Sequence, residues 1–472
     1  MKLKAPQISI APEDPFGEDT LERKESAEIL AELLSSLTES SVLSINGTWG
    51  SGKTTFIKMW QAYLVQQGFP CIYFNAWAND FTEDATAALI AELGLGIDEL
   101  DIKEDTRKEV KEIYEGARKL SGLLLRRAIP TALKIATYGM VDLEQKTEEE
   151  LADLVSNISS EQIDQYEQSK NTLVTFRESL EAMVSKICGE QQLIIFIDEL
   201  DRCRPDFAIS ILEKAKHFFS ISNIIFVFAV DKEQLGHSIR SIYGQGMDAD
   251  GYLRRFIDFE YRLPLPDPVK YTKYLFNRFG FDEYFRNRVT RYAQYEPDEI
   301  IETFAALSKS FGLSLRTMEQ CFSTLSIVLR TTPPNIGLHP ILLTTLIILN
   351  ASDSSLYENY INRQISAKVV RDRIKKTSEG KEFFLTNYGI ALDAFIEAGN
   401  CDYKELLALR ENYKVQLNKP GISDDQEESI ALKMQVIDDI MRSRRGNISK
   451  YLSDKINISH RFVRSEDSAK DS

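Results

Sequence analysis

The sequence predicts an α/β protein built on a doubly wound, mainly parallel β-sheet, with a helical insertion and a helical C-terminal region. Three observations support this prediction. Short runs of Val, Ile, Leu and Phe recur at strand length, segments with helical spacing separate them, and one glycine-rich loop joins a run to a helix. Strands that alternate with helices form parallel sheets with helices on both faces.

The expected elements follow one another in a simple alternating order. Four of the strands are nearly continuous in apolar residues, which is typical of a strand that is covered on both faces. The fifth alternates and stops before Pro264. In chain order the expected elements are a helix at Leu21–Leu37, a strand at Val42–Asn46, a helix at Phe56–Gln66, and strands at Cys71–Asn75 and Leu193–Ile197. A helix at Phe207–Phe219 and strands at Ile224–Val230 and Ile257–Tyr261 follow.

The helical insertion lies between the second and third strands. Within it, Val110, Ile113, Tyr114 and Ala117 share one helical face. Turn residues and a polar terminus mark further boundaries. The predicted segments are an irregular lead-in at 1–18, a core at 19–270 with the insertion at about 85–190, a helical lid at 271–330, a helical region of unknown role at 331–460 and a disordered tail at 461–472.

The charge balance is acidic. The chain has 72 acidic and 57 basic residues, a net charge of −15. A protein that follows a nucleic-acid backbone regardless of sequence needs clustered excess Lys and Arg. The composition argues against that class and leaves only a local basic groove open.

The cysteines are scattered, without a CxxC pair or a nearby His cluster, so the sequence predicts neither a disulfide framework nor a zinc site. They are Cys71, Cys188, Cys203, Cys321 and Cys401.

A soluble, cytoplasmic protein is expected, because the N-terminus lacks an apolar run of signal-peptide length. Leu123–Val141 is apolar but carries three cations, each of which costs roughly 2.5–3.5 kcal/mol at the centre of a membrane span. Ile341–Leu349 is too short to span a bilayer. Both segments are therefore predicted to be buried helices.

A phosphate-binding loop follows the first strand. The segment matches G-x-x-x-x-G-K-[ST], and its glycines permit a tight loop whose amides face phosphate oxygens at the start of a helix. Lys53 is expected at the β- and γ-phosphates and the Thr54 hydroxyl on Mg²⁺. The nucleotide-binding residues are Gly47, Thr48, Trp49, Gly50, Ser51, Gly52, Lys53, Thr54 and Thr55.

An acidic cluster ends the third strand. Asp198 stands at the strand terminus, where a P-loop protein needs a carboxylate for the Mg²⁺ shell. Glu199 is placed to orient and deprotonate the attacking water. Asp201 has two readings, a role in positioning water or an ion pair with Arg202.

These motifs resemble the KAP family of P-loop NTPases. The resemblance is carried by INGTWGSGKTTF, YFNAW and LIIFIDELDRCRPDFAISILEKAKHFF, and FVFAVDKEQL and YLRRFIDFEYRLPLP extend it, so that it covers roughly residues 19–330. It implies a sheet with an additional strand between the P-loop strand and the Mg²⁺ strand, ATP as the nucleotide, and a switch or scaffold role. The family's acidic box usually reads D-D-x-D-R, and here Glu199 takes its second position.

Asp231 ends the fourth strand, where related ATPases hold a polar sensor near the γ-phosphate; an N-cap role fits equally well. Leu21 and Arg23 resemble the segment that packs near adenine, although a plain amphipathic role is as good an interpretation. Trp49 and Trp77 fit packing roles better than ligand contacts.

Three arginines are candidates for completing the catalytic site. Arg254 and Arg255 precede the fifth strand, where oligomeric relatives place an arginine finger, and a solvated basic pair is the alternative. Arg316 resembles the family's lid arginine, and a surface salt bridge is its alternative. The finger reading implies a homo-oligomer.

Three functions fit these motifs. The first is a Mg²⁺-dependent ATPase that drives a conformational or assembly switch. The second is a nucleotide-binding scaffold with little turnover that assembles with partner proteins. The third, a P-loop kinase, fits least, because the Asp-Glu pair suits water activation. Several bacterial cytoplasmic members of the family look like parts of phage-defence systems, so the resemblance admits that setting.

Overall fold

The computed structural model describes residues 1–460 with internal gaps. The gaps are 5–7, 38, 83, 127–159, 190, 218–220, 288–294, 334–335 and 444–446. Most of the Leu123–Val141 segment and the predicted tail at 461–472 lie outside the described residues. The chain forms two compact units. One is an α/β unit of Ser9–Asp19 and Arg23–Pro264, and the other is a helical unit of Met1–Ile8, Thr20–Glu22 and Leu265–Ser472.

The α/β unit is built on a five-stranded parallel sheet in the order β2-β3-β4-β1-β5. This confirms the predicted doubly wound sheet. Strand β4 lies between β1 and β3, which confirms the additional strand implied by the resemblance. The strands are β1 (Ser41–Asn46), β2 (Cys71–Asn75), β3 (Leu193–Asp198), β4 (Ile224–Val230) and β5 (Phe259–Arg262).

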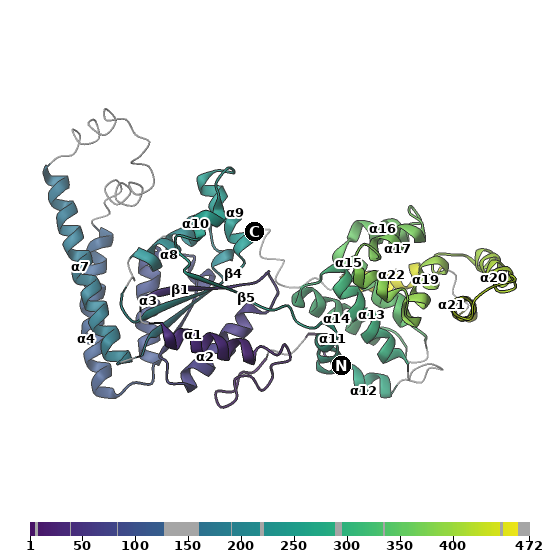
Figure 1. The fold of residues 1–472 in the computed structure, drawn as a ribbon, viewed down its shortest axis with the longest axis horizontal. Helices are drawn as coiled ribbons and strands as arrows, with labels where there is room; N and C mark the ends of the chain where they lie inside the picture. The colour runs from purple at the N-terminus through teal and green to yellow at the C-terminus, as the bar shows by residue number, and fades with distance from the viewer. Residues whose placement is uncertain are drawn as a thin grey trace. The chain divides into compact units, whose positions relative to one another are not determined.

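Helices cover both faces of this sheet (Figure 1). In that view α1 and α2 lie on one side, and α8, α9 and α10 lie on the other. The helices are α1 (Lys24–Ser36), α2 (Lys53–Gln66), α3 (Ala85–Glu99), α4 (Glu104–Arg126), α7 (Ser160–Cys188), α8 (Pro205–His217), α9 (Lys232–Tyr243) and α10 (Ala249–Leu253), with short 3₁₀ turns η1 (Trp77–Asn79) and η2 (Leu200–Arg202).

The insertion contains a long helical pair, α4 and α7, at one end of the unit in Figure 1. Val110 and Ala117 of α4 are buried, as the helical spacing predicts, and Phe176 and Leu180 of α7 are buried in the same core. Ile113 and Tyr114 pack partly buried against that core. The apolar face of α4 is therefore covered from within the insertion itself.

Aromatic packing fixes the helix that follows the phosphate-binding loop. Trp60 of α2 is fully buried, stacks on Phe56 with ring centroids 5.9 Å apart, and meets Phe196 of β3 edge-on at 5.5 Å. Buried aromatic pairs contribute favourable contact beyond the area they bury. This packing holds the first turns of α2 close to the strand that ends in Asp198.

The helical unit contains the segment that the sequence predicts to be a short buried helix. Ile341–Leu349 lies within α15, and all its residues are buried, which confirms that prediction. The N-terminal residues also belong to this unit: the Lys2 amide donates to Phe279 O at 2.7 Å, and the Ser326 hydroxyl donates to Lys2 O at 2.7 Å. The helices are α11 (Pro268–Arg278), α12 (Phe281–Arg286), α13 (Glu296–Phe311), α14 (Leu315–Arg330), α15 (Pro340–Ser352), α16 (Ser354–Ile361), α17 (Ala367–Ile374), α18 (Ser378–Phe383), α19 (Asn387–Ala398), α20 (Tyr403–Leu417), α21 (Asp424–Arg442) and α22 (Ile448–His460).

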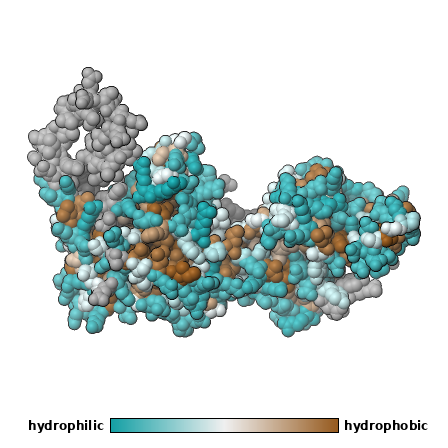
Figure 2. Space-filling view, viewed as in Figure 1, coloured by the Kyte–Doolittle hydropathy of each residue, from teal (hydrophilic) through white to brown (hydrophobic). Residues whose placement is uncertain are grey.

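The face shown in Figure 2 is mainly hydrophilic in each unit, with hydrophobic residues gathered in smaller patches. Across the described ranges, none of the helices combines the length and the apolar character that crossing a membrane requires.

Candidate nucleotide-binding and hydrolysis site

The site lies at the carboxyl edge of the sheet, where four neighbouring strands end together. Asn46 of β1 pairs with Val230 of β4, and Asn75 of β2 pairs with Asp198 of β3. Because all these strands are parallel, the residues that follow them meet at one edge. The phosphate-binding loop, the acidic cluster and Asp231 therefore converge, although they are far apart in the sequence.

The loop has the backbone that its glycines predict. The Gly47 amide donates to Val230 O at 3.1 Å and anchors the start of the loop to β4. Gly50 and Gly52 have φ values of 77° and 83°, in the left-handed region that side chains other than glycine disfavour. Gly52 is the N-cap of α2, which begins at Lys53. The first amides of α2 therefore lie at the end of the loop, and amides at a helix N-terminus can bind an anion.

Lys53 folds back over the loop. Its Nζ atom donates to Gly47 O at 2.5 Å and to Thr48 O at 3.4 Å, and the residue is 8% exposed. Burial lowers the pKa of Lys53, while the carboxylates of Asp201, Asp231 and Asp198 raise it. The ammonium group therefore lies near three carboxylates, and it is a fixed positive charge that can bind a phosphate oxygen.

Asp198 and Thr54 form the pair that fits a magnesium ion. Asp198 is 1% exposed and accepts hydrogen bonds from the Tyr73 hydroxyl at 2.9 Å, the Glu199 amide at 2.8 Å and the Thr54 side chain. Burial raises the pKa of Asp198, and these three hydrogen bonds lower it. A hydroxyl and a carboxylate in contact supply the hard oxygen ligands that Mg²⁺ prefers.

Glu199 is held by two neighbours. Its φ is 60°, a left-handed conformation that is uncommon for a residue with a side chain. Its Oε2 accepts from Asn75 Nδ2 at 3.1 Å, and its Oε1 lies 2.7 Å from Arg202 Nη1. The Arg202 guanidinium also lies over the Trp77 ring, 5.7 Å from its centroid.

Of the two readings of Asp201, the ion pair with Arg202 is not the one found, because Arg202 pairs with Glu199. The turn η2 explains the difference. A 3₁₀ turn brings side chains three positions apart to the same side, so residue 202 meets residue 199 and not its neighbour.

Asp201 and Asp231 both bind Trp49 of the loop. The indole Nε1 donates to Asp201 Oδ2 at 2.5 Å, and the Trp49 amide donates to Asp231 Oδ2 at 2.9 Å. Asp231 also caps α9 by accepting from the Gln234 amide at 3.3 Å. Burial raises the pKa of Asp201, and Lys53 lowers it.

Neither Trp49 nor Trp77 packs in the hydrophobic core. Trp49 is 46% exposed and Trp77 is 55% exposed, whereas Trp60 is the tryptophan buried in the core. Trp49 bonds through its polar edge, and Trp77 carries the Arg202 guanidinium on its face. Both tryptophans therefore contact charged side chains of the acidic cluster.

The three candidate arginines are exposed. Arg254 and Arg255 follow α10 directly and precede β5, and the Arg255 guanidinium lies 6.0 Å from the centroid of the Tyr252 ring. Arg316 belongs to the helical unit, where it is the second residue of α14.

Sequence analysis missed one contributor to the site, Tyr73, and gave another, Arg23, a different role. Tyr73 lies on β2 beside β3, and the pairing of these strands places its hydroxyl on Asp198. A polar residue near the end of the strand next to Asp198 was the available signal. Arg23 is not within a helix, because α1 begins at Lys24, and its guanidinium donates to the carbonyls of Ser51 and Gly52 in the loop.

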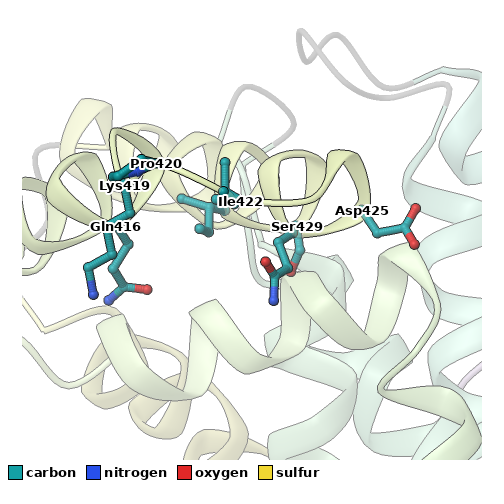
Figure 3. A pocket seen from close by; sticks show the side chains of 9 residues that line it. Gln416, Lys419, Pro420, Ile422, Asp425 and Ser429 are labelled. Atoms are coloured by element: carbon teal, nitrogen blue, oxygen red, sulfur yellow. The ribbon is translucent and has the colours of Figure 1, made fainter.

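A pocket in the helical unit lies outside this chemistry. Figure 3 shows it at the connection between α20 and α21, lined by side chains that form no group of facing acid, base and nucleophile. The labelled residues are Gln416, Lys419, Pro420, Ile422, Asp425 and Ser429.

Comparison with known proteins identifies the family. The model of the KAP family P-loop domain matches residues 23–332, about two thirds of the chain. No curated protein sequence matches. Among solved structures, the chain is similar to the Aeropyrum pernix ORC2 protein in its ADPNP-ADP complexes, with 13% identity, 91% of this chain and 98% of that chain covered, and a TM-score of 0.33. Drosophila ORC bound to DNA shows 14% identity, 87% and 84% coverage, and a TM-score of 0.30. On the family match, which includes the loop and the acidic cluster, the chain belongs to the KAP family of P-loop NTPases.

Proposed function

We propose that this protein is a Mg²⁺-dependent ATPase whose hydrolysis drives a conformational or assembly switch. The observation that carries the proposal is the convergence of Lys53, Thr54 and Asp198 at one edge of the sheet. A fixed cation, a hydroxyl and a buried carboxylate beside a glycine-rich loop form a site for a nucleoside triphosphate and its metal. ATP as the nucleotide rests on the family resemblance.

Each residue has a defined task in this proposal. The loop amides and Lys53 bind the β- and γ-phosphates and keep them in place for in-line attack. Thr54 and Asp198 hold Mg²⁺, which supplies neutralising charge to the phosphate oxygens. Tyr73 orients the Asp198 carboxylate by its hydrogen bond at 2.9 Å.

Glu199 is the proposed general base, because it directly follows the metal-binding carboxylate and is a carboxylate on the same edge. It takes a proton from the attacking water once its oxygens are free to accept one. Asp201 is the alternative base. Its contact with Trp49 ties it to the loop and fits a structural role better.

One observation favours the second candidate function, a scaffold with little turnover. Both oxygens of Glu199 are engaged, one by Asn75 and the other by Arg202. Each oxygen keeps a second lone pair, but the two contacts fix the orientation of the carboxylate, so a base that is held in this way is less free to turn toward an attacking water. If binding of a partner releases Glu199, the same arrangement makes ATP hydrolysis switchable. If nothing releases it, the protein is a scaffold that hydrolyses ATP slowly.

A phosphate-release assay with purified protein tests the proposal. ATP and Mg²⁺ are supplied with the wild-type chain and with Lys53→Ala, which removes the cation from the loop. We expect release by the wild type and none by the variant. Release that is equal in both, or absent from the wild type under all protein concentrations and with candidate partners, contradicts the ATPase assignment.

We also propose a cytoplasmic setting in which the chain acts with copies of itself or with a protein partner, in a phage-defence system. The family resemblance supports this setting. Cells that carry the wild-type gene are expected to plate phage less efficiently than cells that carry Lys53→Ala. Equal plating across a broad phage panel contradicts the defence role and leaves the ATPase proposal standing.

A further inference from the structure

Arg23 is a buried charged residue behind the phosphate-binding loop. It immediately precedes α1 and is 2% exposed. Its Nη2 atom donates to Ser51 O at 2.7 Å, and its Nη1 atom donates to Gly52 O at 3.2 Å. Both acceptors are main-chain carbonyls of the loop. The guanidinium therefore binds the loop backbone through two of its carbonyls.

The geometry of the peptide bond turns these two contacts into a constraint on two amides. In a planar trans peptide, the C=O and the N–H point in opposite directions. The Ser51 carbonyl shares its plane with the Gly52 N–H, and the Gly52 carbonyl shares its plane with the Lys53 N–H. If both carbonyls face Arg23, both N–H groups point to the opposite side of the loop.

The loop needs this constraint because glycine does not supply it. Gly52 has a φ of 83° and no side chain that restricts the peptide plane before it, whereas its own carbonyl also accepts from the Phe56 amide at 3.0 Å in the first turn of α2. An amide cradle binds phosphate well only when its N–H groups are already aligned. A planar guanidinium with fixed donors can hold two carbonyls at once.

The same guanidinium also contacts the segment that follows β5, the strand next to β1. Arg23 Nη2 lies 3.4 Å from Pro264 O, just after β5, and the Leu263 amide donates to Asn46 O at 2.9 Å. The loop and the segment that leaves β5 thus share an anchor, which fixes the position of the loop as well as the direction of its amides.

We propose that Arg23 is a positioning residue for the nucleotide: it presets the Gly52 and Lys53 amides toward the phosphates from behind the loop. The inference rests on the proposed nucleotide-binding function. It assigns Arg23 to the phosphates, and not to the adenine-side role that the resemblance implied for its segment.

The chain offers a matched control in Arg107. Its guanidinium also binds main-chain carbonyls in the α/β unit, with Nη1 2.6 Å from Asp98 O and Nη2 2.8 Å from Leu100 O. These carbonyls belong to the helical insertion. Removing either arginine takes one donor from each of two carbonyls, and in each pair one carbonyl keeps a main-chain donor, Phe56 N on Gly52 O and Ile102 N on Leu100 O. Only Arg23 touches the loop.

The experiment measures binding of ADP and of inorganic tripolyphosphate by calorimetry, with Mg²⁺ present, to the full chain. The variants are Arg23→Met, Arg23→Lys and Arg107→Met. We expect Arg23→Met to bind both ligands with an affinity lower on the order of tenfold, and Arg107→Met to bind them with the affinity of the wild type. Arg23→Lys keeps the charge but loses the planar fork, so it should also bind both ligands more weakly. Tripolyphosphate separates a phosphate effect from an adenine effect.

The outcomes are distinguishable. Wild-type affinity in both Arg23 variants overturns the inference alone. If Arg23→Lys binds with wild-type affinity and Arg23→Met binds weakly, the positive charge alone matters and the positioning role is overturned. If the Arg23 variants bind ADP weakly but bind tripolyphosphate with wild-type affinity, Arg23 acts on the adenosine part of the nucleotide and the positioning role is again overturned. If Arg23→Met does not fold, Arg23→Lys decides. A wild type that binds neither ligand overturns the proposed function and the inference together, whereas one that binds but never hydrolyses ATP overturns only the ATPase.

Discussion

The Glu199 carboxylate lies 2.7 Å from the Arg202 guanidinium, across the 3₁₀ turn η2. The pair is partly shielded, with the Glu199 side chain 14% exposed and the Arg202 side chain 26% exposed. An ion pair this sheltered is screened less than a surface pair. The freedom of Glu199 to turn toward an attacking water therefore depends on what competes for Arg202.

Glu199→Gln should keep nucleotide binding and lose hydrolysis. The amide retains the shape of the side chain but accepts no proton, so turnover is expected to fall on the order of 10²–10⁴-fold. Single-turnover phosphate release and ADP calorimetry measure the two properties separately. Turnover within about twofold of wild type, together with loss in Asp201→Asn, makes Asp201 the base.

Asn75→Ala should raise basal hydrolysis. Asn75 Nδ2 holds Glu199 Oε2 at 3.1 Å, and removing that bond frees one oxygen for water. A hydrogen bond of about 1 kcal/mol corresponds to about fivefold in rate. Asn79→Ala is the matched control, because Asn79 Nδ2 donates to Asn75 O at 3.0 Å in the same loop without touching Glu199. Unchanged or lower turnover in Asn75→Ala argues against restraint of the base.

Arg254 and Arg255 should act across a subunit boundary. Both side chains are exposed at the junction between α10 and β5, and an arginine that neutralises the γ-phosphate is worth about 10³–10⁵ in rate. An Arg254→Ala/Arg255→Ala variant mixed with Lys53→Ala should recover phosphate release, since each chain supplies what the other lacks. Failure to recover, with turnover of the wild type independent of its concentration, makes Arg316 the better candidate.

Glu299 should make the helical unit less stable as the pH rises. Burial, helped by Glu296 and Asp439, raises the pKa of Glu299 to about 7 from its usual 4.5. Between those values the folded state keeps a proton that the unfolded state releases, so stability falls across that window, by about 3 kcal/mol in all. Below pH 4.5 this loss is absent.

Glu299→Gln mimics the protonated side chain and should therefore stabilise the protein at pH 8, with less than half of that gain at pH 5. Chemical denaturation of both proteins at the two pH values measures the difference. Asp298→Asn, at an exposed position in the same turn of α13, should change stability by less than about 1 kcal/mol and without this pH profile. Equal stabilisation by Glu299→Gln at both pH values contradicts the raised pKa.

The sheet and the loop were predictable because their signals are local. Buried parallel strands are continuous apolar runs, and the lysine and threonine directly follow the last loop glycine. The fifth strand begins at Phe259 and not at the expected Ile257. Asp258 explains this start, because its carboxylate accepts from the Val42 amide at 2.8 Å just ahead of the strand.

The partners within the site were less predictable because they depend on contacts distant in the sequence. Arg23 meets Ser51 only through the packing of α1 against the sheet, and nothing in its neighbourhood in the chain marks it as a loop residue. Trp49 meets Asp201 only because the ends of β1 and β3 lie at one edge. The sequence identifies which residues carry the chemistry, whereas the tertiary structure decides which of them restrain the others.

The helical unit is discontinuous, and this affects the order in which the chain can complete its fold. Its first residues, Met1–Ile8, are synthesised before any of the sheet, yet Lys2 bonds to Phe279 and Ser326. Domains tend to fold as they leave the ribosome, from the N-terminus onward. The α/β unit, which ends at Pro264, can therefore close first, while Met1–Ile8 waits for the residues that follow.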